Sequence, residues 1–271
     1  MESQGRDGRA QGTEGATRTG GGPASEHSGA APGAGMPVIA VVPCRAGSER
    51  VKNKNTRPFA EIPGGLLELK LSQLAAVAEL EEIIVSTNDP AVAEFARGFS
   101  AEQDSRVTVI DRPDELGRSS TPMSEFIQYL GALRDQGTML MTHVTHPFVT
   151  AAVFQELIEA WHRAQQRGHD SLLTVTKLHT FLWDAQRRPF NYDDAEEKWP
   201  RSQDIAPLFE INHAAYLIPF RRVREIGDRV GENPALHEMS GEAVMDIDWD
   251  DEFALLQDIA RAKQHRGATL V

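Results

Sequence analysis

The chain has 271 residues, of which 40% are hydrophobic and 25% charged, the composition of an ordinary globular protein. Its formal net charge of -12 excludes the broad basic surface with which proteins bind nucleic acids, so any phosphate binding must be local. The only cysteine, Cys44, cannot form an intrachain disulfide, which suits a cytoplasmic location, and no apolar run reaches membrane-spanning length.

Residues 1–35 contain no Val, Ile, Leu, Phe, Trp, Tyr or Cys and are dominated by small residues and scattered charges. A segment of this kind cannot bury a core, so we predict a disordered N-terminal tail. Met36 stands directly before the first strand-like run. A start of translation at Met36 and a genuine flexible tail are equally compatible with the composition.

From Met36 onward, strand-like and helix-like patterns alternate. Short β-branched and apolar runs predict four buried strands, at residues 37–42, 82–86, 106–110 and 138–142. Apolar residues at helical spacing predict three helices, at residues 66–80, 90–99 and 124–133. This alternation indicates an α/β layered fold with a mainly parallel sheet. Ligands of such sheets bind at the carboxyl ends of the strands, so we expect the site there.

Residues 179–204 interrupt this alternation. They are rich in Trp, Arg, Asp and Pro and have no clean hydrophobic period. The segment is long for a plain connector, so we expect either a lid or an oligomerisation arm.

The loop after the first strand concentrates positive charge. Gly47 permits a tight turn whose amide N–H groups can face an anion, and Arg45, Arg50, Lys52 and Lys54 stand in the same loop. The pattern favours a nucleotide-phosphate cradle, with a solvated basic loop as the alternative. It is neither a P-loop nor a Gly-x-Gly-x-x-Gly motif.

Alternating aspartates lie near the C-terminus. Asp246 and Asp248 project from one face of an extended segment, with Ile247 as the buried spacer. Magnesium prefers carboxylate oxygens together with substrate phosphate, so we predict that this pair binds Mg²⁺. Asp250 and Asp251 are interpreted as the acidic N-terminus of the helix that follows.

The basic loop resembles the signature of the acylneuraminate cytidylyltransferases, the CMP-sialic acid synthetase family, in which Arg-x-Gly-Ser-Lys is followed by Lys-Asn. The residues that match are Arg45, Gly47, Ser48, Lys54 and Asn55. Glu49 stands where the family carries a lysine that is expected to hold the triphosphate. Arg50, one place along, is the residue that can supply the missing charge.

The resemblance covers most of residues 37–260. Residues 85–89 are similar to the family's Val-Ser-Thr-Asp, with an ordinary helix N-cap as the alternative. Residues 112–116 look like its Arg-Pro-x-Glu-Leu segment, whose downstream serines, here Ser119 and Ser120, approach the nucleotide. A capping turn is the alternative for each serine. The aspartate pair matches the family's metal-binding Asp-x-Asp.

The acceptor region departs most from the family pattern. His143 replaces a glutamine that the family points at the sugar acid, and Val149 replaces an arginine, while Thr145 keeps the frame. Zinc at His143 and His146 has weak support, because no cysteine pair lies nearby. Residues 201–216 look like the family's Arg-Arg-Gln-Asp and Asn-Gly-Ala-x-Tyr segments. The resemblance implies an acceptor site formed by four residues, His143, Thr145, Gln203 and Asn212.

The resemblance implies a Rossmann-like nucleotide-diphospho-sugar transferase fold, with a cytidylyltransferase catalytic domain over residues 36–271. The implied reaction moves CMP from CTP to an acidic acceptor, a sialic-acid-like 2-keto-3-deoxy sugar acid, and releases pyrophosphate. Nucleotide contacts are implied for Arg45, Ala46, Gly47, Ser48, Arg50, Lys54, Asn55, Ser119 and Ser120. Arg45 and Lys54 would hold phosphates, beside Mg²⁺ on Asp246 and Asp248.

Family members are commonly dimers that exchange an arm, and the resemblance places that arm at residues 179–204. The departures, among them His213 in place of a glycine, leave two alternatives open. One is the same chemistry on a different acid, such as an octulosonate or a phosphonate. The other is a degenerate member that binds nucleotide without turnover.

Overall fold

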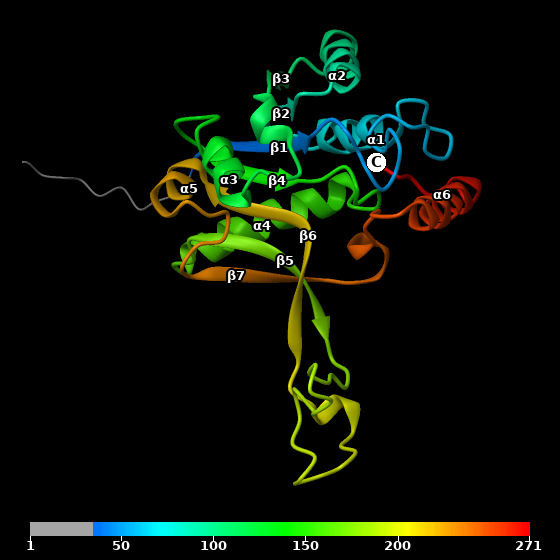
Figure 1. Ribbon diagram of the computed structural model, residues 1–271. Coiled ribbons are helices and arrows are strands. Elements are labelled where there is room, and N and C mark those ends of the chain that lie inside the picture. Colours follow the sequence, from blue (N-terminus) through cyan, green and yellow to red (C-terminus); the bar gives the residue numbers. More distant parts are fainter. Residues whose placement is uncertain (1–34) are drawn as a thin grey trace, which may run out of the picture. The chain divides into compact units, whose positions relative to one another are not determined.

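A seven-stranded sheet organises residues 35–271, the part of the chain that the computed structural model describes (Figure 1). The strands, in order across the sheet, are β3 (Val107–Asp111), β2 (Leu80–Thr87), β1 (Val38–Cys44), β4 (Thr138–Thr142), β6 (Leu208–Pro219), β5 (Ser171–Leu178) and β7 (Pro234–Met239). Strand β6 is antiparallel to both neighbours, and every other pair is parallel. The predicted α/β fold with a mainly parallel sheet is confirmed. The predicted tail lies outside the described residues except for its last position.

Helices cover both faces of the sheet. On one face lie α1 (Gly65–Ala75), α2 (Pro90–Glu102), α4 (Ala151–Gln166) and α6 (Asp250–His265), whose apolar side chains share the larger core cluster with the sheet. On the other lie α3 (Met123–Gly131) and α5 (Phe220–Ile226). Short 3₁₀ turns are η1 (Asp114–Gly117), η2 (Ser202–Asp204) and η3 (Gly241–Val244). Within the described residues, no helix has the length and apolar character needed to span a membrane.

The first helix is shorter than its apolar spacing predicts. Helix α1 ends at Ala75, whereas the pattern predicted a helix to residue 80. The Arg106 guanidinium donates to the carbonyl oxygens of Ala75, Val77 and Leu80, which satisfies backbone groups where the helix stops. Val77 and Leu80 remain fully or almost fully buried, so the apolar spacing continues after the helix has ended.

Helix α1 also fixes the loop that follows β4. The fully buried Lys70 ammonium donates to the carbonyl oxygens of His146 (3.0 Å) and Val149 (3.4 Å). Gln73 donates to the carbonyl of Pro147 at 2.8 Å. Side chains of one helix thus hold the backbone of this loop, which contributes to the site described below.

Lys70 gives the protein a measurable pH dependence of stability. Burial lowers its pKa from 10.5 to about 7, so between these values the unfolded chain holds a proton that the folded chain lacks. The free energy of unfolding should therefore rise with pH in this window, by up to about 1.4 kcal/mol per pH unit. Below pH about 7 Lys70 is protonated in both the folded and the unfolded chain, so it contributes no increase in the free energy of unfolding.

Lys70→Met should remove the increase of the free energy of unfolding with pH, whereas Lys198→Met, at an exposed position, should keep it. Denaturant titrations across the window test this, and equal slopes in all three proteins contradict it.

Candidate active site

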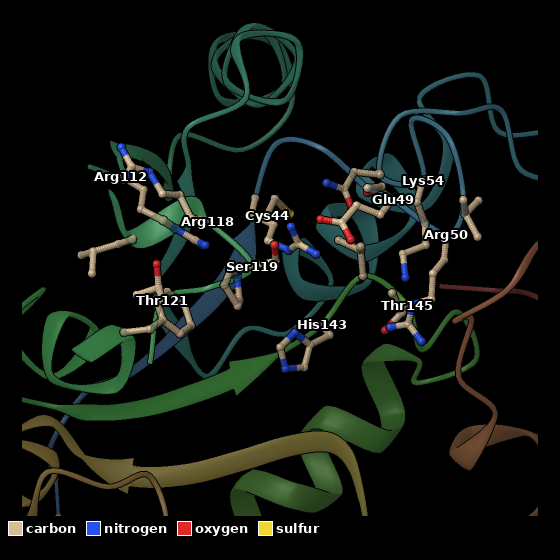
Figure 2. Close-up of a pocket in the computed structure, with 18 of the residues that line it drawn as sticks. Cys44, Glu49, Arg50, Lys54, Arg112, Arg118, Ser119, Thr121, His143 and Thr145 are labelled. Carbon is tan, nitrogen blue, oxygen red and sulfur yellow. The ribbon is translucent and has the colours of Figure 1, made fainter. Parts of the chain in front are cut away.

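A pocket of about 420 Å³ lies at the carboxyl ends of β1 and β4 (Figure 2). The loop after β1 contributes Arg45, Ser48, Glu49, Arg50, Lys54 and Asn55. The segment between β3 and α3 contributes Arg112, Leu116, Arg118, Ser119 and Thr121. The loop after β4 contributes His143, Val144 and Thr145. Figure 2 shows the first two groups facing each other across the opening, with His143 below them.

The pocket lining is positively charged although the chain is acidic. Five of its side chains are cationic, namely Arg45, Arg50, Lys54, Arg112 and Arg118, and Glu49 is the carboxylate among the lining residues. Gly47 adopts φ 72°, the left-handed conformation that the predicted tight turn requires. A local concentration of positive charge in an acidic protein suits a polyanionic ligand such as a triphosphate.

One backbone N–H group of this turn already donates a hydrogen bond to an acceptor within the protein. The N–H of Ala46 donates to Oδ1 of Asn88 at 2.9 Å, so it anchors the loop to the end of β2. Gly47 lines a smaller neighbouring pocket together with Lys52 and Asn53. Of the predicted loop residues, the structure therefore brings Arg45, Ser48, Arg50, Lys54 and Asn55 to the main pocket, but not Lys52, Ala46 or Gly47.

The aspartate segment is bound directly to the loop after β4. The N–H of Ile247 donates to the carbonyl of Thr145 at 3.0 Å, and the Ile247 side chain is fully buried, as the alternation predicts. Lys54 Nζ donates to the Ile247 carbonyl at 2.8 Å and lies 3.9 Å from Oδ1 of Asp248. Arg50 Nη2 forms an ion pair of 2.8 Å with the same oxygen. The phosphate-cradle loop and the aspartate pair therefore meet, although neither aspartate lines the 420 Å³ pocket itself.

Asp246 faces a buried histidine that the sequence analysis did not assign to the site. Its Oδ1 accepts the N–H of Ile247 at 2.8 Å and lies 3.7 Å from Nδ1 of His146. Nε2 of His146 donates to the carbonyl of Asn212 at 2.8 Å, which fixes the ring. Burial lowers the pKa of His146, and the Asp246 charge opposes that shift. Within residues 35–271 His146 Nδ1 forms no hydrogen bond, so the ring lies beside the Asp246 carboxylate without binding it.

The aspartate pair fits magnesium as a donor set. Both carboxylates supply hard oxygens, and their side chains are 38% and 42% exposed beside the cationic pocket. Magnesium is commonly held by one or two carboxylates, with substrate phosphate and water completing its shell. Within residues 35–271 no three His, Cys, Asp or Glu side chains are grouped to hold a metal. The remaining ligands would come from substrate and water, and zinc at His143 and His146 gains no support.

The segment between β3 and α3 supplies arginines that the site prediction lacked. Arg112 donates to the carbonyl of Ser86 at 2.8 Å and lies over the Phe126 ring at 4.5 Å, while Arg118 forms no ion pair within residues 35–271. Ser119 lines the pocket, whereas Ser120 does not. Neither serine caps α3, because its N-cap is Pro122.

The predicted acceptor residues are not all brought together. His143 and Thr145 line the pocket. Asn212 does not, because its Oδ1 accepts the Thr174 hydroxyl at 2.6 Å and its Nδ2 donates to Thr176 within the sheet. Gln203 is exposed in η2, within the 179–207 connection that extends beyond β5 and β6 (Figure 1).

Two histidines, His143 on the loop after β4 and His213 on β6, have distinctive states. Burial, and then the Arg229 charge, lower the pKa of His143 to about 3, so its imidazole is neutral. His213 adopts φ 59°, at the position where the resembling family has glycine. Its Nδ1 shares a hydrogen bond of 2.6 Å with the Tyr216 hydroxyl.

The fold and the site together define an α/β protein with a cationic pocket at the carboxyl ends of β1 and β4, beside a pair of carboxylates. Residues 39–265 match the sequence model of a family described as cytidylyltransferase. The chain belongs to the cytidylyltransferase family.

Two relatives that are similar to the chain in sequence are both named as N-acylneuraminate cytidylyltransferases. The chain is 23% identical over 227 residues to N-acylneuraminate cytidylyltransferase A of Danio rerio, covering 81% of this chain and 50% of that protein. It is 23% identical over 141 residues to N-acylneuraminate cytidylyltransferase of Escherichia coli, covering 52% of this chain and 31% of that protein. The chain therefore spans half or less of the curated relatives that it matches.

Solved structures share the fold at low identity. A 4-diphosphocytidyl-2C-methyl-D-erythritol synthase from Anaerococcus prevotii superposes with a TM-score of 0.59 at 13% identity, covering 85% of this chain and 99% of that chain. A CMP:2-keto-3-deoxy-manno-octonic acid synthetase complexed with CTP gives a TM-score of 0.56 at 12% identity, with the same coverage. These likenesses show the nucleotidyltransferase-type α/β fold.

Glu49 offers a direct test of the phosphate cradle. It lines the pocket and forms no ion pair within residues 35–271, so it neither points away from the pocket nor pairs with a neighbouring cation. A carboxylate about 4 Å from one phosphate charge opposes binding by about 1 kcal/mol even at the dielectric constant of bulk water. Glu49→Gln should therefore lower the KM for CTP about fivefold. Glu102→Gln, outside the pocket, is the matched control. An unchanged or higher KM in Glu49→Gln contradicts this placement of the triphosphate.

Proposed function

We propose that the protein transfers CMP from CTP to an acidic acceptor, a sialic-acid-like 2-keto-3-deoxy sugar acid, and releases pyrophosphate. The observation that carries this proposal is the junction of the cationic loop and the aspartate pair, with Arg50 2.8 Å from Asp248. Family membership and the names of the curated relatives support CTP as donor and an acylneuraminate-type acceptor. The single cysteine is free and buried, which suits a reducing compartment such as the cytoplasm.

In this proposal an acceptor hydroxyl oxygen loses its proton to water and bonds to the α-phosphorus of CTP, while the bond from that phosphorus to the β-phosphate oxygen breaks and pyrophosphate leaves. Arg45, Arg118 and Lys54 neutralise the phosphates and hold them in line with the acceptor. Asp246 and Asp248 would hold Mg²⁺, which would lower the pKa of the acceptor hydroxyl and stabilise charge on the phosphoryl oxygens. Neutral His143 stands at the acceptor side and can accept or donate a hydrogen bond.

We further propose a homodimer formed through the 179–207 arm. Three aromatic side chains of the arm are more than half exposed, namely Trp183, Phe190 and Trp199. Exposed aromatic side chains of this size are typical of protein interfaces. Gln203 lies on the same arm, so a partner's arm is the route by which it would reach an acceptor site.

An acceptor panel tests the reaction. The protein is incubated with CTP, Mg²⁺ and, separately, N-acetylneuraminate, a 3-deoxy-octulosonate and a simple phosphonate, and products are identified by mass spectrometry. The proposal predicts a CMP conjugate of N-acetylneuraminate as the main product. A conjugate of another acid would reassign the acceptor. CTP binding without any conjugate would identify a nucleotide-binding member, the alternative that the pocket-facing Glu49 favours.

A further inference from the structure

Arg229 reaches over the central strands from the loop between α5 and β7. The Asp228 carboxylate accepts the backbone N–H groups of Arg229 (2.6 Å) and Val230 (3.2 Å), which fixes the base of this side chain. The guanidinium carbon lies 4.3 Å from the centre of the Tyr216 ring on β6. Its Nη1 lies 3.9 Å from Sδ of Met141 on β4. The Arg229 guanidinium therefore lies against strands β4 and β6, near the carboxyl end of β4.

The Arg229 charge has no carboxylate partner. Within residues 35–271 no carboxylate oxygen lies within 4.0 Å of its guanidinium, and its Nη1 contacts a thioether, a weak acceptor. Two other half-buried arginines have carboxylate partners: Arg134 pairs with Glu82, and Arg222 pairs with Asp170 and Glu232. A guanidinium carries five N–H donors, and stacking on an aromatic ring leaves those at its edge free. The free N–H groups of Arg229 can therefore bind the anionic group of a ligand.

The side chains that the Arg229 guanidinium contacts, Tyr216 and Met141, are uncharged, and the Asp228 carboxylate binds backbone N–H groups at its base. His143 follows Met141 by two residues and lines the pocket. The Arg229 charge lowers the pKa of both His143 and His213, after burial, which places the cation near both rings. His213 is in turn hydrogen-bonded to Tyr216, the residue on which Arg229 stacks. Arg229 is half-buried and is not among the lining residues of the 420 Å³ pocket, but it contacts Met141, two residues before His143, which does line the pocket.

We propose that Arg229 binds the carboxylate of the acceptor, with His143 and His213 flanking it as neutral hydrogen-bonding groups. The planar guanidinium edge matches a carboxylate bidentately, which fixes orientation as well as charge. In a 2-keto acid in its hemiketal form, the carboxylate and the attacking hydroxyl share one carbon. Holding the carboxylate therefore also places the hydroxyl. This assignment rests on the proposed function and names Arg229 as the residue that makes the acceptor site specific for acids.

The test measures binding of N-acetylneuraminate and of its uncharged methyl ester by calorimetry, without nucleotide. The wild-type protein should bind the acid more tightly than the ester. Arg229→Gln should weaken acid binding about ten- to a hundredfold, the range expected for hydrogen bonds to a charged group, and leave ester binding unchanged. Arg229→Lys should fall between the two, because it keeps the charge but loses the bidentate edge. Arg221→Gln, on the exposed side of α5, is the matched control and should bind like the wild type.

CTP affinity and melting temperature are measured on the same proteins, and both should stay unchanged. The assignment is overturned if Arg229→Gln binds the acid as tightly as the wild type, or if the wild type does not prefer the acid to the ester. It is also overturned if Arg229→Lys loses as much CTP affinity as acid affinity. If the wild type binds the acid through Arg229 but releases no pyrophosphate from CTP, the proposed function fails while the Arg229 assignment stands.

Discussion

Replacing Asp248 by asparagine is expected to lower kcat about a hundredfold or more, the effect of losing several kcal/mol of transition-state stabilisation. The substitution removes one negative charge and keeps the shape of the side chain. Asp248 is 42% exposed and pairs with Arg50, so its loss should leave the melting temperature nearly unchanged. Steady-state kinetics at saturating CTP and acceptor, together with a thermal melt, give both quantities.

Asp251→Asn is the matched control for this substitution. Asp251 lies in the first turn of α6, three residues further along, where its carboxylate accepts the N–H of Glu252 at 3.1 Å. It should keep wild-type kcat, because it has no contact with the phosphate cradle. If Asp248→Asn stays within a few-fold of the wild type, the metal site lies elsewhere.

Replacing Lys54 by methionine is expected to lower kcat/KM for CTP about a hundred- to a thousandfold, comparable to removing one preorganised electrostatic group from an active site. Its ammonium lines the pocket, donates to the Ile247 carbonyl at 2.8 Å and lies near Asp248, so it joins the triphosphate site to the aspartate segment. Burial lowers the pKa of Lys54, and Asp248 and Asp246 oppose that shift. The Lys54 ammonium thus lies between the pocket and the aspartate pair, where phosphate and metal would meet.

Lys52→Met separates this role from the general charge of the loop. Lys52 lies in the same loop but lines two smaller pockets outside the main one. It should therefore change kcat/KM little, and both variants should be compared by thermal melting. Equal losses in the two variants would show that only the net charge of the loop matters.

Strands β1, β2 and β4 could be predicted because they are largely buried on both faces. The run at 138–142 coincides with β4, and residues 37–42 and 82–86 fall within or next to β1 and β2. Strand β6 lacks such a signature. Its first half exposes Phe209 and Ile211, while its second half is buried, so neither a period of two nor a continuous apolar run covers it.

The site could be predicted where a local motif carries it, as in the basic loop. Its long-range assembly could not, because the hydrogen bond between Ile247 and Thr145 joins backbone atoms and leaves no side-chain pattern. The same holds for the pairing of the Ala46 N–H with Asn88, which removes a donor expected to be free. Arg229 belongs to no motif, and only its stacking on Tyr216 beside His143 reveals it.

Pyrophosphate release from the four ribonucleoside triphosphates tests the central claim most directly. Each nucleotide is supplied at the same concentration with Mg²⁺ and N-acetylneuraminate, with and without excess chelator. The account predicts release from CTP in clear preference to ATP, GTP and UTP, and its loss when the metal is chelated. Equal turnover of all four nucleotides, or full activity in excess chelator, would contradict it.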